Sequence, residues 1–307
     1  MDIRIQNLTK TYGVQKAVDD ISFEVKTGEI LGFLGPNGAG KTTTMKIITG
    51  YIDGDQGDVT IGGKSVASGQ TKGYIGYLPE HNPLYLEMPV MDYLGFCAAI
   101  QGMDKGIIPG RIKQMVKVCG LNAEKHKKIG ELSKGYRQRV GLAQAMIHDP
   151  EILILDEPTT GLDPNQIVEI RELIKNIGQE KTVILSTHIL PEVEATCDRI
   201  LIINKGKIVA DGTAATLRKT AQGQQVLHVR IEDADVNTIY GKLKELPTVA
   251  MVDIIDAANN RFEVQSTQDA ISNREVFDLC VKNRWALTEI IPFETRLEDI
   301  FRDLTLN

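Results

Sequence analysis

The sequence predicts an α/β fold in which helices cover both faces of a mainly parallel sheet, followed by a small α+β domain. Uniformly apolar runs such as Ile152–Leu155 alternate with segments of helical periodicity, as in sheets buried on both faces. A glycine-rich segment at 35–40 joins an apolar strand to a helical segment. Near residues 219–225 the composition becomes polar and small, as in domain linkers. We therefore expect a larger domain at 1–220 and a smaller one at 225–307.

Apolar and β-branched runs predict the strands of the first part of the chain, and helical spacing predicts one helix there. The expected strands are Ile3–Leu8, Ile21–Val25, Glu29–Leu34, Gly57–Ile61 and Tyr74–Leu78, and the expected helix is Thr42–Thr49. The strand Glu29–Leu34 leads directly into the glycine-rich loop, so we expect it to be buried.

Apolar residues at spacings of three and four, such as Tyr93, Phe96 and Ile100, predict a helical insertion at about 89–150. The α/β pattern resumes after it. The expected elements are the strand Ile152–Leu155, the helix Pro164–Ile177, the strand Thr182–Leu185 and the helix Leu190–Thr196. The insertion therefore interrupts the α/β domain and does not form a domain of its own.

The segment after residue 225 has the element order βαββαβ, which predicts a small ferredoxin-like domain. The expected elements are the strand Val226–Ile231, the helix Val236–Leu246, a hairpin of Val249–Ile255 and Arg261–Val264, the helix Asp269–Asn283, the strand Ala286–Ile291 and a terminal helix Arg296–Leu304. The sequence does not indicate what this accessory domain does.

Composition and charge exclude several classes of protein. The 307 residues carry a net charge of -6, so we expect no nucleic-acid partner, because such partners are bound by basic fields. The cysteines are scattered without metal-ligand spacing, which predicts reduced thiols. The polar start predicts no signal peptide. The longest apolar runs are far shorter than the roughly 20 residues of a membrane-spanning helix.

The glycine-rich loop fits the pattern G-x-x-x-x-G-K-[ST] between a strand and a helix, the context that a phosphate-binding loop requires. We expect its residues and the next one to bind nucleotide: Gly35, Pro36, Asn37, Gly38, Ala39, Gly40, Lys41, Thr42 and Thr43. Glycines let backbone N–H groups converge on phosphate oxygens, and the helix N-terminus adds a favourable dipole. Lys41 is expected to reach the β and γ phosphates, and the Thr42 hydroxyl to ligate Mg²⁺. The loop alone predicts only a nucleoside triphosphate.

Further features follow in an order that resembles the ATPase subunits of ABC transporters. An apolar strand ends in Asp156 and Glu157, and Leu132–Gln138 resembles the signature LSGGQ. Gly161–Asp163 resembles the D-loop, and Thr187-His188 matches the switch histidine. The resemblance covers residues 1–220. It implies hydrolysis of MgATP in a homodimer, or with a paired ATPase subunit, and a transmembrane permease as partner.

The resemblance implies a chemical role for three of these residues. Asp156 corresponds to the carboxylate that binds Mg²⁺ directly or through water. Glu157 corresponds to the base that polarises the attacking water, and His188 to the sensor of the γ phosphate. Without the upstream loop, the two carboxylates are equally well explained as the acidic end of a strand.

Other residues are expected to contact a nucleotide from the opposite side or at its base. In the family, Ser133 and Gly135 close over the γ phosphate bound by the opposite protomer, and Asp163 crosses the dimer interface. Ser133 is equally suited to cap a helix, and the two roles are compatible. Tyr12 lies where the family carries an aromatic that stacks on adenine, which favours ATP over GTP only weakly. An ordinary core or surface tyrosine remains the alternative.

The chain departs from the family pattern at specific positions. Lys134 and Tyr136 replace the usual Gly and Gln of the signature, and Glu80 stands where the family has a glutamine. Glu80 still reaches Mg²⁺ and a water but has no amide donor, and we count it among the catalytic residues. These departures resemble the branch that serves ABC-2 type exporters, and within it the gliding-motility transporters of Bacteroidetes. Residues 296–301 are similar to the SLEDVF ending of that branch.

The resemblance implies a peripheral protein on the cytoplasmic face of the inner membrane and leaves the substrate open. Three other kinds of protein remain as alternatives, and each would differ from this chain in a feature of its sequence. A soluble ABC ATPase of DNA repair or translation would carry a long coiled coil or a second phosphate loop. A P-loop kinase or GTPase has no use for a signature motif. A module that binds ATP without hydrolysing it would not need Glu157 and His188.

Overall fold

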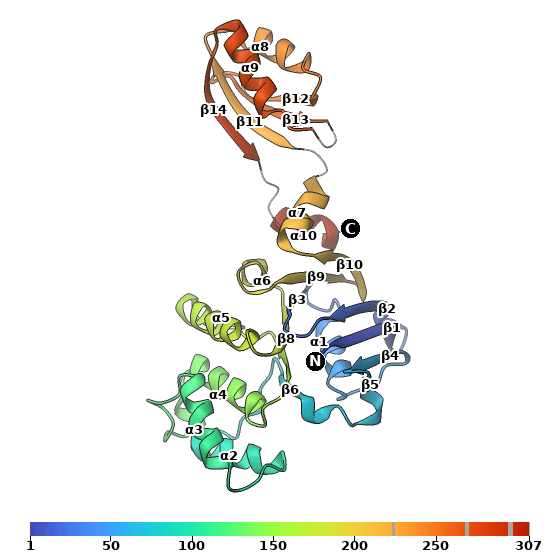
Figure 1. Ribbon diagram of the computed structural model, residues 1–307, viewed down its shortest axis with the longest axis vertical. Coiled ribbons are helices and arrows are strands. Elements are labelled where there is room, and N and C mark those ends of the chain that lie inside the picture. Colours follow the sequence, from blue (N-terminus) through green and yellow to red (C-terminus); the bar gives the residue numbers. More distant parts are fainter. Residues whose placement is uncertain (223–224, 268–269, 294–296, 307) are drawn as a thin grey trace. The chain divides into compact units, whose positions relative to one another are not determined.

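The computed structural model describes residues 1–222, 225–267, 270–293 and 297–306. The chain divides into two compact units (Figure 1). The first contains Met1–Thr213 and the end of the chain from Leu304, and the second contains Ala214–Asp303. The first unit therefore ends a few residues before the polar stretch that marks the boundary in the sequence. Residues 223–224 of that stretch lie outside the described residues.

The central sheet of the first unit has the strand order β10-β9-β3-β8-β7-β6. Its strands are β3 (Ile30–Leu34), β6 (Ile75–Leu78), β7 (Ile152–Asp156), β8 (Thr182–Thr187), β9 (Arg199–Asn204) and β10 (Lys207–Gly212). All pairs are parallel except β9 with β10, which form an antiparallel hairpin. Every residue of β3, β7 and β8 is buried, which explains why their side chains are apolar or small, apart from Asp156 at the end of β7.

A second, antiparallel sheet has the order β2-β1-β4-β5. It contains β1 (Ile3–Tyr12), β2 (Gln15–Val25), β4 (Gln56–Ile61) and β5 (Lys64–Ser65). Short 3-10 helices lie at Val66–Ser68, Lys72–Tyr74 and Ile129–Glu131. A core forms where this sheet meets α1 (Lys41–Ile48) and the central sheet, and Phe23 of β2 packs on Phe33 of β3 with ring centroids 5.6 Å apart. The N-terminal strands thereby fix the position of the loop after β3.

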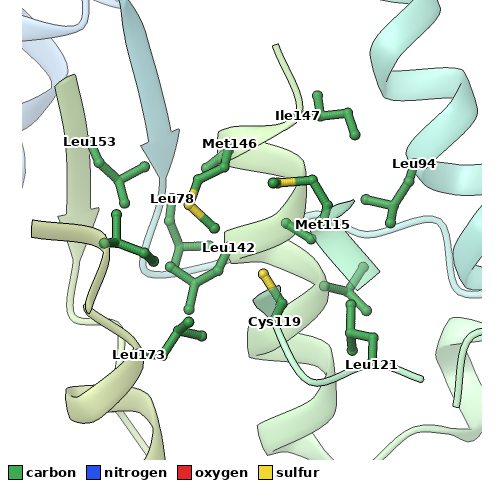
Figure 2. Packing of buried hydrophobic residues seen from close by; sticks show 14 of the residues in the cluster. Leu78, Leu94, Met115, Cys119, Leu121, Leu142, Met146, Ile147, Leu153 and Leu173 are labelled. Atoms are coloured by element: carbon green, nitrogen blue, oxygen red, sulfur yellow. The ribbon is translucent and has the colours of Figure 1, made fainter. Parts of the chain in front are cut away.

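The predicted helical insertion contains α2 (Val90–Ile100), α3 (Ile108–Val118) and α4 (Lys134–Met146). Together with α5 (Pro164–Gly178), it surrounds a second core, and α6 (Leu190–Thr196) packs beside α5, β3 and β8. In Figure 2, Leu94, Met115 and Leu142 of the insertion point toward Leu153 of β7 and Leu173 of α5. The insertion is therefore packed onto the central sheet by continuous apolar contact.

The second unit contains the predicted βαββαβ arrangement. Its elements are α7 (Ala214–Gln222), β11 (Val226–Glu232), α8 (Val236–Lys244), β12 (Val249–Asp256), β13 (Arg261–Ser266), α9 (Asn273–Asn283) and β14 (Ala286–Phe293), followed by α10 (Leu297–Leu306), whose last residues from Leu304 belong to the first unit. The antiparallel order β12-β13-β11-β14 is that of a ferredoxin-like sheet. The predicted helix starts at Asp269 and Arg296 lie outside the described residues. Within the described part of the chain, no helix combines the length and apolar character needed to cross a bilayer.

Candidate active site

The phosphate loop connects β3 to α1, and close backbone packing explains two of its glycines. A Cβ atom on Gly35 would lie 2.4 Å from the carbonyl oxygen of Ile203, and one on Gly40 would lie 2.3 Å from that of Ala17. Gly40 has a φ of 111°, and Gly38 has a φ of 79°. Such angles suit glycine and strain other residues. The loop therefore wraps around the N-terminus of α1 in a conformation that other residues would distort.

The ammonium group of Lys41 lies inside this loop. Its Nζ donates to the carbonyl oxygens of Gly35 at 2.7 Å and Pro36 at 3.3 Å, and it lies 3.4 Å from Oε1 of Glu157. Lys41 and Glu157 are each only 6% exposed. A buried cation held by neutral carbonyls and one carboxylate is well placed to exchange these partners for a phosphate.

Glu157 directly follows β7 and carries the contacts expected of a catalytic carboxylate. Its φ of 51° is in the left-handed region, which is costly for a residue with a side chain. The backbone N–H donates to the carbonyl oxygen and the Oγ of Ser186, at 3.1 and 3.2 Å. The carboxylate accepts from Thr160 at 3.3 Å and lies 2.9 Å from Nδ1 of His188. Side chains from the ends of neighbouring parallel strands therefore meet at one point.

A cavity of about 470 Å³ opens beside the phosphate loop. The residues that line it are Tyr12, Gln15, Ala17, Asn37, Gly38, Gly40, Lys41, Thr42, Thr43, Glu80, Glu157, Thr160 and His188. Of the remaining loop residues, Gly35 and Pro36 hold Lys41 through their carbonyl groups, and Ala39 is buried. Tyr12 is 53% exposed at the edge of this cavity, so its ring is accessible to a planar base.

Asp156 is fully buried at the end of β7. Ser186 Oγ donates to its Oδ1 at 2.5 Å, while Oδ2 has no hydrogen-bond partner among the described residues. Burial raises the pKa of Asp156; hydrogen bonding by Ser186 and by the Thr42 side chain opposes this shift, and the charges of Glu80 and Glu157 add to it. Asp156, Thr42 and Glu80 line a neighbouring cavity. Two carboxylates and a hydroxyl are oxygen ligands of the kind Mg²⁺ prefers, and the unpaired Oδ2 fits such an ion.

The signature and D-loop residues lie elsewhere in the first unit. Ser133 accepts a hydrogen bond from the backbone N–H of Tyr136 at 3.4 Å and so caps α4. A Cβ atom on Gly135 would lie 2.8 Å from the side-chain amide of Gln166. Asp163 caps α5 by accepting from the backbone N–H of Gln166 at 3.0 Å. In the described part of the chain, neither Ser133, Gly135 nor Asp163 lines the cavity beside the phosphate loop.

The structure adds residues to the site that the sequence did not indicate. Gln15, Ala17 and Thr160 line the cavity, and Ser186 hydrogen-bonds both Asp156 and the backbone of Glu157. Thr160 belongs to the segment that follows Glu157. Of the added residues, it is the one whose place beside Glu157 could have been predicted from the sequence. Gln15 and Ala17 lie at the start of β2, a segment that carries no motif that signals a nucleotide.

The family follows from comparison with known proteins. A protein-family model described as "ABC transporter" matches residues 18–160, and one described as "AAA domain, putative AbiEii toxin, Type IV TA system" matches residues 128–193. The uncharacterised ABC transporter ATP-binding protein YhcH of Bacillus subtilis is 35% identical over 99% of this chain and 95% of its own length. The chain belongs to the ABC transporter ATP-binding subunits.

Other members of the family agree with this assignment. The bacitracin transport ATP-binding protein BcrA of Bacillus licheniformis is 38% identical to this ABC subunit over 75% of each chain. A solved structure of an ATP-binding subunit of an ABC transporter has a TM-score of 0.65 and 30% identity, over 72% of this chain and 93% of that one. The predicted α/β fold with its phosphate loop is confirmed. As a member of this family, the ABC subunit binds ATP and is an ATPase.

Proposed function

We propose that two copies of this ABC subunit sandwich MgATP between them and use its hydrolysis to drive an ABC-2 type exporter. The proposal rests on one observation: the residues predicted to bind nucleotide form two groups, and only one group lines the cavity beside the phosphate loop. Lys41, Glu157 and His188 line one cavity, whereas Ser133 and Gly135 start α4 outside it. A second copy supplies the missing side of the site if the two subunits face each other with opposite orientation.

In this dimer, the phosphate tail takes the place of the carbonyl and carboxylate partners of Lys41. Glu157 is thereby released to accept a proton from the attacking water, and His188 keeps its carboxylate oriented. Thr42, Asp156 and Glu80 would hold Mg²⁺, which would supply positive charge to neutralise the phosphates. Ser133 and Gly135 of the opposite copy offer a hydroxyl and the N-terminus of α4 to the γ phosphate.

ATP closes the dimer only through contacts that the γ phosphate makes with both copies. Hydrolysis removes that phosphate and with it the difference in free energy that favours the closed form. The cycle of closure and opening is the mechanical output. We expect the helical insertion and residues 81–90 to transmit it to the cytoplasmic side of a permease.

Export is favoured over a soluble role by the relatives. BcrA is named for bacitracin transport, and it aligns with this chain over 235 residues. The likeness of residues 296–301 to the ending of ABC-2 ATPases supports the same branch. A peripheral position on the cytoplasmic face of the inner membrane follows if a permease is the partner. The likeness to gliding-motility transporters stays a prediction from sequence.

The sandwich is tested with Glu157→Gln, which leaves nucleotide contacts in place and slows hydrolysis. We expect this variant to elute as a dimer with MgATP and as a monomer without it, measured by size exclusion with light scattering. The matched control is the double variant Glu157→Gln and Lys41→Ala, which should stay monomeric because it lacks the phosphate cation. A Glu157→Gln protein that remains monomeric at saturating ATP contradicts the proposal.

The export role requires a separate experiment. The tagged full-length subunit is purified from detergent-solubilised membranes of its own host, and the associated polypeptides are identified by mass spectrometry. A co-purifying polytopic membrane protein supports the transporter role. Recovery of the ATPase only from the soluble fraction, with no membrane partner, would support the soluble alternative instead.

A further inference from the structure

A buried glutamate connects the two loops that carry Glu157 and His188. Glu192 lies in the first turn of α6 and is only 2% exposed. Its Oε2 accepts a hydrogen bond from the hydroxyl of Thr159 at 2.8 Å and another from the hydroxyl of Thr187 at 2.9 Å. A carboxylate accepts stronger hydrogen bonds than a neutral oxygen, so a single atom holds both hydroxyls firmly.

The two donors occupy informative positions. Thr159 is the second residue after Glu157, and Thr187 immediately precedes His188. The carbonyl oxygen of Thr187 also accepts from the backbone N–H of Gly35 at 3.4 Å, at the start of the phosphate loop. Glu192 is therefore hydrogen-bonded to both sides of the catalytic pair, although its carboxylate contacts neither Glu157 nor His188 directly.

In the described part of the chain, the pairing of β7 with β8 reaches these loops only through the backbone hydrogen bond from the N–H of Glu157 to the carbonyl oxygen of Ser186. Between β7 and β8 the last paired residues are Asp156 and Ser186, and Glu157 and His188 lie beyond this pair. Glu157 also has a strained left-handed backbone, and such conformations persist only where the surroundings enforce them. Ser186 fixes the backbone N–H of Glu157, and Glu192 fixes the residues that follow.

A purely structural role for Glu192 explains less of this arrangement. The residue at the N-cap of α6 is Ile189, and no hydrogen bond from the backbone of α6 to the Glu192 carboxylate occurs among the described residues. The second oxygen, Oε1, is buried and has no hydrogen-bond partner among them. A buried carboxylate with one unpaired oxygen is costly, and an apolar residue would fill the same space at lower cost.

We propose that Glu192 is a positioning residue that keeps Glu157 and His188 in register for ATP hydrolysis, through Thr159 and Thr187. Thr159 also leads into the segment that ends at Asp163, so the same carboxylate connects the switch histidine to the D-loop. The inference rests on the ATPase activity of the family and does not depend on the export role.

The test compares Glu192→Ala with Glu192→Gln in the full-length protein. The glutamine side chain retains an oxygen that accepts both hydroxyls, whereas the alanine side chain has none. We expect Glu192→Ala to lower kcat by about 10- to 100-fold, as small misplacements of catalytic groups do, while the Kd for ATP stays within about twofold. Glu192→Gln should retain kcat within about threefold. Glu172→Gln, at an exposed position of α5, is the control and should resemble the wild type.

Thr159→Val and Thr187→Val each remove one donor while preserving shape, and they carry the test if Glu192→Ala does not fold. Each should lower kcat with little change in ATP affinity. Combining either with Glu192→Ala should add almost nothing, because the three side chains act as one unit. Wild-type turnover in both valine variants, or a parallel loss of ATP affinity and thermal stability in every variant, would overturn the proposal.

Discussion

Nδ1 of His188 lies 3.0 Å from Oε1 and 2.9 Å from Oε2 of Glu157. The same carboxylate is 3.4 Å from the ammonium of Lys41. The candidate base is therefore shared between the ring of His188 and the ammonium group of Lys41, which is expected to bind phosphate. Nucleotide entry has to redistribute these contacts, which links occupancy of the phosphate site to the availability of Glu157.

The first prediction concerns His188. Replacing it with alanine should lower kcat by about 10- to 100-fold, because the Glu157 carboxylate loses the group that orients it. ATP affinity should change little, since the phosphate loop is intact. Steady-state turnover and nucleotide titration measure the two effects. His126→Ala is the control, because that ring is exposed in the helical insertion. Equal turnover in both variants would show that His188 does not act on Glu157.

The second prediction concerns the cost of burying Asp156. Its pKa is raised in the folded state, chiefly by burial. The destabilisation from its charge is therefore fully present above the raised pKa and disappears as pH falls toward the ordinary value. Without Mg²⁺ or nucleotide, Asp156→Asn should melt roughly 2–4 °C higher than the wild type at neutral pH. This shift corresponds to a gain of about 1 kcal/mol in the free energy of unfolding of a domain of this size.

The pH dependence and the activity make this prediction specific. The difference in melting temperature between Asp156→Asn and the wild type should shrink as the pH falls from the raised pKa toward the ordinary carboxyl value, because the buried carboxyl then takes up a proton. ATPase activity should be nearly lost at every pH, since Asn cannot replace an anionic ligand of Mg²⁺. A variant that melts below the wild type at neutral pH would show that the Asp156 carboxylate stabilises the empty site.

Local motifs predicted much of the candidate site. Each motif follows a strand that can be recognised in the sequence by its run of apolar residues. The motifs are the loop from Gly35 to Thr42, the carboxylates at the end of β7 and the histidine after β8. Parallel pairing then brings the strand ends together, and the structure places Lys41, Glu157 and His188 around one cavity. The strand and helix pattern of the ferredoxin-like unit was also predictable, because each element has its own periodicity.

Contacts between segments distant in sequence could not be predicted in this way. The sequence does not reveal that the carbonyl of Ala17 closes over Gly40, or that Glu192 binds hydroxyls from two loops. The hairpin of β9 and β10 was missed as well. The strand Lys207–Gly212 has no fully buried residue, and Gly206 before it and Gly212 at its end weaken the strand pattern. Helix α7 formed where a polar composition indicated a linker.

The third prediction addresses Glu80, which stands where the family has glutamine. If its carboxylate contributes to binding Mg²⁺, Glu80→Gln should raise the Mg²⁺ concentration for half-maximal ATPase activity severalfold, because one negative charge is lost. Glu87→Gln is the control, since that side chain is 88% exposed in the same segment. ATPase titrations with Mg²⁺ at fixed ATP measure the effect. Identical titrations for Glu80→Gln and the wild type would place Glu80 outside the metal site.

The last prediction separates two glycines of the phosphate loop. A Cβ on Gly40 would meet the carbonyl oxygen of Ala17 at 2.3 Å in addition to the strain of its positive φ, whereas one on Gly38 would meet nothing within 4 Å. Gly40→Ala should therefore lower the free energy of unfolding by several kcal/mol, and Gly38→Ala by about 1 kcal/mol. Urea denaturation without nucleotide measures both.

Gly38→Ala should lose ATP affinity although it loses little stability. A methyl group on Gly38 projects into the open space beside the loop, where a phosphate has to approach the backbone. Gly38→Ala should thus remain folded and still bind ATP at least tenfold more weakly, measured by calorimetric titration. If Gly38→Ala binds ATP normally while Gly40→Ala is fully stable, the backbone of this loop is not the phosphate cradle that its glycines indicate.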